Sequence, residues 1–129
     1  MKKTQIACLP VTGDQNPYQH LMMEGLNSDA SLHAVHGIEH KFFGIALTIL
    51  KFRPDYLHFD WVGRYYYRRW SWLTYVSIPL FCAQLLLARW LGTRLVWTFH
   101  NILPHDLPEV GVHRFCQRFL AKRCDWIRV

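Results

Sequence analysis

The chain has 129 residues, which is enough for one domain with a core of modest size. Its composition, 51% hydrophobic and 16% aromatic, supplies such a core and excludes a wholly disordered protein. Fifteen Lys and Arg residues against nine Asp and Glu residues give a formal net charge of +6, which favours an anionic partner such as a phosphate, a lipid headgroup or a nucleic acid.

Short apolar runs rich in β-branched and aromatic residues alternate along the chain with longer segments of helical spacing. We expect strands at residues 4–9, 31–35, 56–61, 95–99 and 126–129. We expect helices that begin at Pro17 and that cover residues 39–52, 71–91 and 112–122. The first helix is marked by Asn16, Pro17 and Gln19, because Asn caps a helix, Pro fits its first position and Gln can reach back to the cap.

Each shorter helix has an apolar stripe that we expect to face a sheet. The residues of these predicted inward faces are Tyr18, Leu21, Met22 and Leu26 in the first helix, Phe42, Phe43, Ala46, Ile49 and Leu50 in the second, and Val112, Phe115, Cys116, Phe119 and Leu120 in the last. Pro54 closes the second helix, because the residue before a proline is disfavoured in helical conformation.

The alternation of strand and helix predicts an α/β fold, a Rossmann-like parallel sheet of about five strands with helices on both faces, in one domain over residues 1–129. In such a sheet every strand-to-helix loop opens at the same edge, so residues 13–16, 60–64 and 100–106 and His36 should converge there. The chain stops on a strand without a covering helix, and we therefore expect it to be a fragment of a longer protein.

The cysteines and histidines give no sign of a metal or disulfide site. No two of the four cysteines have CxxC spacing, so we expect reduced, buried thiols in a cytoplasmic protein. The histidines His33, His36 and His40 are spaced three and four apart, as ligands on one helix face would be. However, Gly37 lies among them and residues 31–35 alternate like a strand, so we expect no metal.

The segment 71–88 is long and apolar enough to suggest a transmembrane helix. Pro79 and Gln84 lie within it and Arg89 stands at its end, so we favour a crossover helix packed on the sheet. The mixture of arginines and aromatic rings in residues 64–72 suits a lipid headgroup layer, and we expect peripheral membrane contact through residues 64–91. No nucleic-acid-binding module accompanies this block, and we expect no nucleic-acid partner.

The stretch from Val96 to Asp106 changes from a buried strand to a polar loop with two imidazoles, an amide and a carboxylate around Pro104. With this stretch, the chain resembles the amino-terminal, acceptor-side domain of GT-B-fold glycosyltransferases, especially the family-4 (group 1) bacterial enzymes of polysaccharide and glycolipid assembly. The matching segments also include the start of the first helix and residues 54–61 and 124–129, so the resemblance covers essentially the whole chain. Its most specific part is the pattern Thr-x-His-Asn-x-x-Pro-His that begins at Thr98.

The resemblance implies a hexosyltransferase-type enzyme that moves a sugar from a nucleotide-sugar donor to a glycan or lipid-linked acceptor held largely by this domain. It implies that His100 lies beside the transferred sugar as the catalytic candidate, since an imidazole can donate to a hydroxyl or take a proton at neutral pH. The implied substrate-binding residues are Gly13, Asp14, Asn16, Tyr18, Asp60, Trp61, Arg64, Asn101 and His105. Trp61 could stack on a sugar ring, and Arg64 could hold the diphosphate of a lipid-linked acceptor.

The family's donor-binding domain has no counterpart in these residues. We therefore expect it to be supplied in cis or in trans, and we expect this chain alone to be inactive. The resemblance implies no metal and no covalently bound cofactor, and a cytoplasmic location at the inner face of the plasma membrane.

Two alternatives remain open. The chain could be a non-catalytic acceptor-binding and membrane-attachment subunit of a two-chain glycosyltransferase, or a fragment of a nucleotide-sugar 2-epimerase, which shares the GT-B fold. A second Rossmann unit further along the reading frame would support a single-chain enzyme, whereas a stop codon would support a split one. The hydrophobic segment 64–91 argues against the soluble epimerase.

Overall fold

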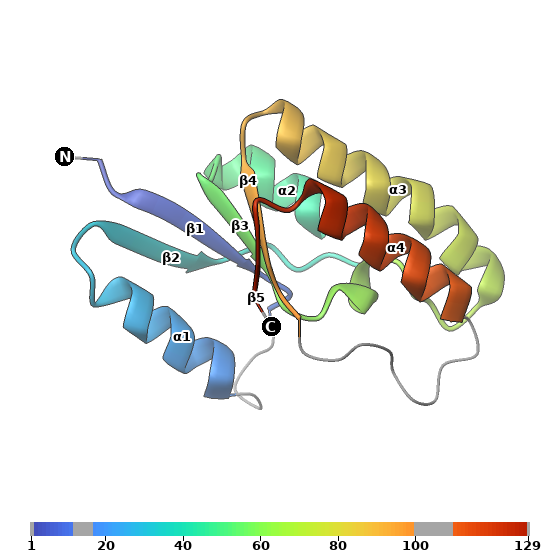
Figure 1. The fold of residues 1–129 in the computed structure, drawn as a ribbon, viewed down its shortest axis with the longest axis horizontal. Coiled ribbons are helices and arrows are strands. Elements are labelled where there is room, and N and C mark those ends of the chain that lie inside the picture. The colour runs from blue at the N-terminus through green and yellow to red at the C-terminus, as the bar shows by residue number, and fades with distance from the viewer. Residues whose placement is uncertain (1, 12–16, 100–109, 129) are drawn as a thin grey trace.

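The computed structural model describes residues 2–11, 17–99 and 110–128, and it is an α/β fold built on a five-stranded, all-parallel sheet. The strands are β1 (Thr4–Leu9), β2 (Leu32–His36), β3 (Tyr56–Phe59), β4 (Arg94–Thr98) and β5 (Trp126–Arg128), in the order β2-β1-β3-β4-β5. The helices are α1 (Pro17–Asn27), α2 (Gly44–Phe52), α3 (Ser71–Trp90) and α4 (Val110–Arg123), with a short 3₁₀ helix, η2 (Val62–Tyr65), after β3. The Rossmann-like architecture predicted from the sequence is confirmed (Figure 1).

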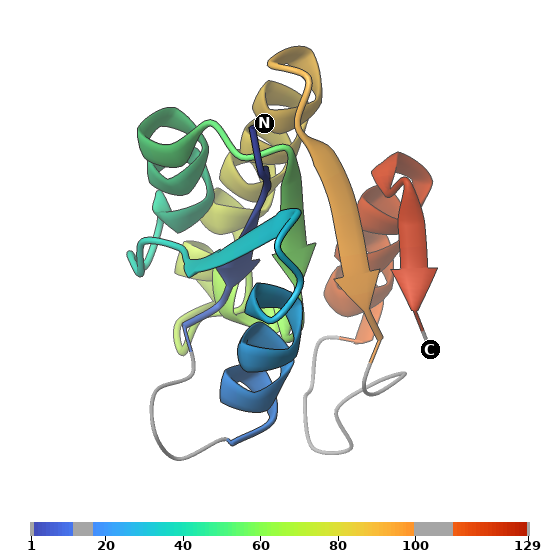
Figure 2. The same ribbon diagram turned by 90° about the vertical axis from the view of Figure 1, so that its left-hand side faces the viewer.

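The strand order determines which face of the sheet each helix covers. The chain moves from β1 outward to β2, then passes back over β1 to β3 and continues in that direction to β4 and β5. Because such crossovers are right-handed, the first helix must lie on the face opposite to the later three. Accordingly, α1 lies on one face, and α2, α3 and α4 lie side by side on the other (Figures 1 and 2).

Most of the core lies between the sheet and the layer of three helices. Leu57 and Phe59 of the central strand β3 have no exposed surface, and they pack in one cluster with fully buried residues of the neighbouring strands and the three helices. The other main members of this cluster are Leu9, Leu95, Ile45, Ile49, Phe81, Leu85 and Leu120. A smaller cluster under α1 contains Cys8, Met23 and Ala34.

The four cysteines are free thiols; all four were expected to be buried, which holds for Cys8 and Cys116, whereas Cys82 and Cys124 are only half-buried. Burial raises the pKa of the Cys116 thiol to about 12, so this group is neutral at physiological pH.

The helix faces predicted from the apolar stripes were partly wrong. Leu21 is 64% exposed, whereas Gln19 and Met23 are the buried residues of α1. Three other residues predicted to face inward are also about half exposed, namely Phe43, Leu50 and Phe115. Large apolar residues occupy both sides of these helices, so hydrophobic spacing alone could not identify the side that packs on the sheet.

Helix α2 begins at Gly44 rather than at residue 39 as predicted. The Nδ1 atom of His40 accepts hydrogen bonds from the backbone N–H groups of Phe42 (3.1 Å) and Phe43 (3.0 Å), which holds residues 41–43 in a turn. The imidazole of His40 therefore provides a hydrogen-bond acceptor for two backbone N–H groups just before the helix starts.

The long helix α3 is the crossover between β3 and β4, and its polar residues Thr74, Ser77 and Gln84 are buried. Gln84 accepts from the backbone N–H of Ala46 (2.9 Å) and donates to the carbonyl of Phe42 (2.7 Å), which fixes α3 to α2. Among the described residues α3 is the one helix long and apolar enough to cross a membrane, yet about a third of its apolar window is buried inside the molecule. Phe81 and Leu85 of α3 are fully buried in the same core cluster as Leu57 of β3, which supports the predicted packing of this helix against the sheet.

The close approach at Gly37 generates a prediction about stability. A Cβ atom on Gly37 would lie 2.4 Å from Leu9 Cδ2 and 2.9 Å from Thr48 Oγ1, so Gly37→Ala must displace a fully buried leucine. We expect this substitution to lower the free energy of unfolding by about 1–3 kcal/mol in urea titrations. The matched control is Gly25→Ala in α1, where a Cβ meets nothing within 4 Å and should stabilise the helix by up to about 1 kcal/mol. Equal stability of the two variants would contradict the packing described at Gly37.

Candidate functional site

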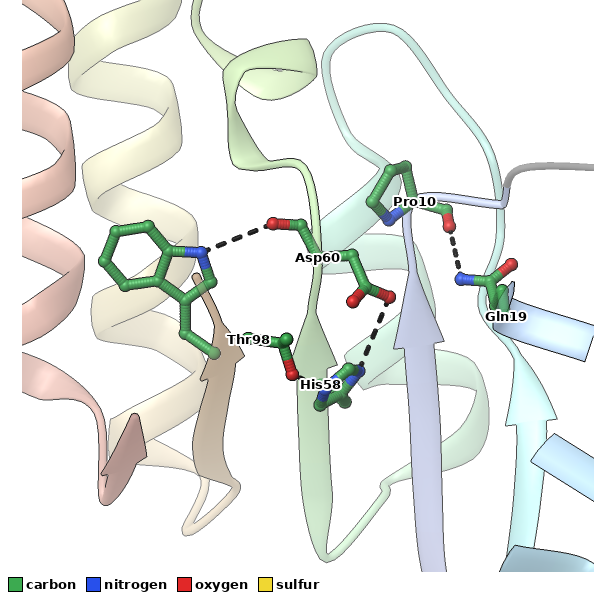
Figure 3. A network of polar contacts seen from close by, with 6 residues as sticks. Pro10, Gln19, His58, Asp60 and Thr98 are labelled. Atoms are coloured by element: carbon green, nitrogen blue, oxygen red, sulfur yellow. Dashed lines mark hydrogen bonds and ion pairs between the residues drawn. The ribbon is translucent and has the colours of Figure 1, made fainter. Parts of the chain in front are cut away.

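The carboxyl ends of β1 and β3 lie side by side with the start of α1. The backbone N–H of Asp60, the first residue after β3, donates to the carbonyl of Leu9 at the end of β1 (3.0 Å). The side chain of Gln19 in the first turn of α1 donates to the carbonyl of Pro10 (2.7 Å), and Figure 3 shows Pro10 at the end of β1 with Gln19 on the side of β1 away from β3. The strand ends that the sequence predicted to converge therefore do meet at one edge.

Strand β4 joins this edge through two contacts with β3. The indole Nε1 of Trp97 donates to the carbonyl of Asp60 (3.3 Å). The ring of His58 points toward Thr98, the last residue of β4, with His58 Nε2 at 2.7 Å from Thr98 Oγ1 (Figure 3). Both contacts cross between neighbouring parallel strands, and they fix the relative positions of the ends of β3 and β4.

Asp60, His58 and Thr98 form a buried polar cluster on one face of the sheet. Their exposed fractions are 2%, 8% and 7% respectively. Asp60 Oδ2 lies 3.7 Å from His58 Nδ1, on the side of the ring opposite to Thr98 (Figure 3). The carboxylate therefore faces one ring nitrogen of His58 while Thr98 contacts the other. The cluster links the ends of β3 and β4 through buried polar side chains.

The Asp60 carboxylate also affects the neighbouring strand. Burial first, and the nearby Asp60 charge second, raise the pKa of Cys8 to about 12. The Cys8 thiol is therefore neutral and unreactive, and a nucleophilic role for it is excluded at physiological pH.

Aromatic and cationic side chains form the rim of this edge. The rings of Tyr18 and Trp61 are half-buried and meet edge to face, with centroids 6.3 Å apart and planes at 77°. Arg64 is exposed, donates to the carbonyl of Val11 (3.2 Å) and pairs with Glu39. Because both members of that ion pair are about half exposed, it is weak, and an incoming anion could replace Glu39 as the partner of Arg64.

Of the residues predicted for the site, Tyr18 and Trp61 meet in a ring contact, and Asp60 and Arg64 lie at the same edge through hydrogen bonds to Leu9 and Val11. Asp60 is buried, so it acts on His58 and on the strand ends rather than as an exposed ligand. The remaining predicted residues lie outside the described part of the chain, and these are His100, Gly13, Asp14, Asn16, Asn101 and His105. Strand β4 ends at Thr98, which is two positions before His100 in the sequence.

Sequence reasoning did not identify His58, Thr98, Gln19 or Glu39 as part of this edge. The signal for His58 was available, because residues two apart along a strand share a face and His58 precedes Asp60 by two. The pairing of His58 with Thr98 had no local signal, since the two residues are 40 positions apart.

No family model matches this chain, and no curated protein matches it. In the part of the chain that the structure describes, no three His, Cys, Asp or Glu side chains are grouped so that they could hold a metal ion. The interpretation of the site therefore rests on the chemistry of its own residues.

A double-mutant cycle tests the buried cluster. We expect Thr98→Val and His58→Leu each to lower the free energy of unfolding by about 1–3 kcal/mol, because each leaves a buried polar partner without its hydrogen bond. The double variant should lose less than the sum of the two by about 0.5–2 kcal/mol. Additive losses in denaturant titrations would show that the two side chains do not interact in solution.

Proposed function

We propose that this chain is the acceptor-binding domain of a GT-B-type glycosyltransferase, in which a donor-binding domain supplied in cis or in trans completes the active site. The observation that carries the proposal is the edge-to-face pair of Tyr18 and Trp61 at the carboxyl edge of the sheet, above the buried cluster at the ends of β3 and β4. Ligands of open parallel sheets bind beyond this edge.

The rim has the chemistry that a sugar ligand requires. An aromatic face packs against the C–H groups of a pyranose ring, while neighbouring polar groups bind its hydroxyls. Trp61 supplies the aromatic face and Tyr18 supports it by the edge-to-face contact. Arg64, held near the same edge by its contact with Val11, suits the phosphate of a nucleotide or of a lipid-linked acceptor.

The proposed reaction is attack by an acceptor hydroxyl on the anomeric carbon of a nucleotide-sugar. The bond from that carbon to the nucleoside diphosphate breaks, and the hydroxyl loses its proton. His100, two positions beyond the end of β4, is proposed to bind a hydroxyl of the transferred sugar or to take the proton. No metal is proposed for this step, because the guanidinium of Arg64 and the other cations of the chain can stabilise the diphosphate.

The role of Trp61 can be tested by binding alone. We expect Trp61→Ala to weaken binding of a recognised sugar about tenfold, because the stacking contact is lost. The measurement is saturation-transfer NMR on a panel of methyl glycosides and on a detergent-dispersed polyprenyl-diphosphate sugar. Trp126→Ala is the matched control, since Trp126 is 70% exposed and begins the edge strand β5, which is separated from β3 by β4. If both variants bind as tightly as the original chain, Trp61 is not part of the site.

The role of His100 is tested by activity. In a transfer assay on the native gene product with a radiolabelled nucleotide-sugar, we expect His100→Ala to reduce turnover by about 10²–10⁴-fold. His33→Ala is the control, because His33 is exposed on the edge strand β2, away from the proposed site. Unchanged turnover in His100→Ala would remove this residue from the mechanism.

A further inference from the structure

Helix α3 exposes an apolar ridge along its whole outer side. The exposed fractions are 66% for Trp72, 60% for Tyr75, 56% for Val76, 49% for Leu86 and 81% for Trp90. Pro79 and Ala83 are also exposed and continue the same three-to-four-residue spacing. At a rise of 1.5 Å per residue, the ridge between the two tryptophans is about 27 Å long.

The layer that contains this ridge carries no negative charge of its own. The sequences of α2, α3 and α4 contain no Asp or Glu residue. Exposed cations lie on the two neighbouring helices, with Lys51 on α2 and Arg114, Arg118 and Lys122 on α4. Arg114 and Arg118 also border a hollow beside Trp97 and Phe99. The three helices lie side by side on one face of the sheet, so the apolar ridge and the cations belong to the same outer layer (Figures 1 and 2).

We propose that the outer surface of α2, α3 and α4 docks on an anionic lipid bilayer. Tryptophan and tyrosine on an apolar helix face, together with arginine and lysine beside them, are the combination that favours the boundary between headgroups and acyl chains. The cations attract anionic headgroups, and the ridge supplies apolar area that enters the bilayer. The chain's net charge of +6 strengthens the attraction.

The packing of α3 defines how the ridge meets the membrane. Its inner side is buried on the sheet, with Phe81, Leu85 and Ala88 completely inaccessible and Gln84 bonded to α2. The helix therefore lies along the bilayer surface with only its outer side inserted, and it does not span the bilayer. This orientation is a property of the folded domain and does not depend on the proposed glycosyltransferase activity.

The same charges argue against a second copy of the chain as the occupant of this surface. A symmetric dimer would bring the same patch of each copy together, and the cations of α4 would then face cations without an acidic partner from any of the three helices. A nucleic acid could neutralise the cations, but it offers no apolar surface for the aliphatic part of the ridge, such as Val76 and Leu86. A lipid bilayer satisfies both parts of the surface.

The docking also places the proposed sugar site beside the membrane. Helix α3 follows β3 and η2 in the chain; its first turn lies at the same height as the carboxyl ends of the strands but to their side, whereas its last turn lies next to the start of β4 (Figure 1). A bilayer under the three helices would therefore run past the same edge that carries Trp61 and Arg64. A substrate anchored in that bilayer would reach Trp61 and Arg64 by extending along the bilayer surface toward this edge of the sheet.

Flotation with liposomes tests this docking surface. The 129-residue chain is mixed with vesicles of phosphatidylcholine alone or with 30% phosphatidylglycerol (roughly the anionic content that gives a strong surface potential), at low and high salt. We expect the chain to float with the anionic vesicles, to float much less with the neutral ones, and to be released by salt. Equal flotation with neutral vesicles, or none with anionic ones, would overturn the proposal.

Matched variants identify the surface. We expect the pair Trp72→Ser and Trp90→Ser, and separately the pair Arg114→Glu and Arg118→Glu, to lower the vesicle partition coefficient at least about tenfold. Leu21→Ser with Trp126→Ser is the apolar control, because both residues are more than 60% exposed and lie outside the three helices. Lys2→Glu with Lys3→Glu is the charge control, since both lysines are exposed beside β1. Circular dichroism shows which variants are folded.

The two alternative occupants of this surface, a second copy of the chain and a nucleic acid, would each give a different experimental result. Sedimentation of a dimer that Trp72→Ser and Trp90→Ser dissociate would assign the ridge to a second copy and overturn the lipid proposal. Displacement of the chain from vesicles by an RNA oligonucleotide at equal charge concentration would assign the surface to nucleic acid and overturn it as well. Loss of sugar binding in Trp61→Ala has no bearing on flotation, so the two proposals fail separately.

Discussion

Strand β3 is the element on which the rest of the molecule depends. It pairs in parallel with β1 on one side and with β4 on the other, and its residues Leu57 and Phe59 are completely buried. Because the three strands run in one direction, their carboxyl ends must reach the same edge. Hydrogen bonds between neighbouring strands continue beyond the end of β3. The N–H of Asp60 donates to the carbonyl of Leu9, and the carbonyl of Asp60 accepts from the indole N–H of Trp97. The candidate site has its geometry because this central strand holds its neighbours in register.

The backbone architecture could be predicted from the sequence because it depends on local signals. Strand β1 and the start of α1 at Pro17 lie where the sequence placed them, and the strict alternation of strand and helix led to the correct parallel sheet. Side-chain orientation was harder to predict. Leu21 was expected inside and is exposed, while the polar Gln19 is buried because the carbonyl of Pro10 offers it a hydrogen bond. The hydrophobic periodicity of a helix does not show where such a hydrogen-bond partner lies.

The candidate site could be predicted in its location but not in its inner structure. The edge was expected to carry Tyr18, Asp60, Trp61 and Arg64, and the structure places these residues there. The buried cluster beneath the rim was not foreseen, since the contact between His58 and Thr98 depends on the pairing of strands distant in sequence. The assignment of catalytic character to His100 remains a prediction.

The outer side of the helical layer explains why the helix faces were difficult to predict. A soluble domain usually exposes a polar side of each helix, and the prediction of inward faces relied on that rule. In α3 the rule fails in both directions, because Thr74 and Gln84 are buried while Trp72 and Trp90 are exposed. A helix that contacts the sheet on one side and lipid on the other is expected to have this pattern.

The central claim is that a sugar binds at the carboxyl edge of the sheet formed by β1, β3 and β4. The most direct measurement is a titration of the ¹⁵N-labelled chain with a recognised glycoside, followed by amide chemical shifts. We expect the shifts to change at Tyr18, Trp61 and Arg64 and to remain constant at Lys2, Gly92 and Arg94, which border a hollow at the opposite edge. Changes confined to that opposite edge, or to the outer surface of α4, would contradict the account.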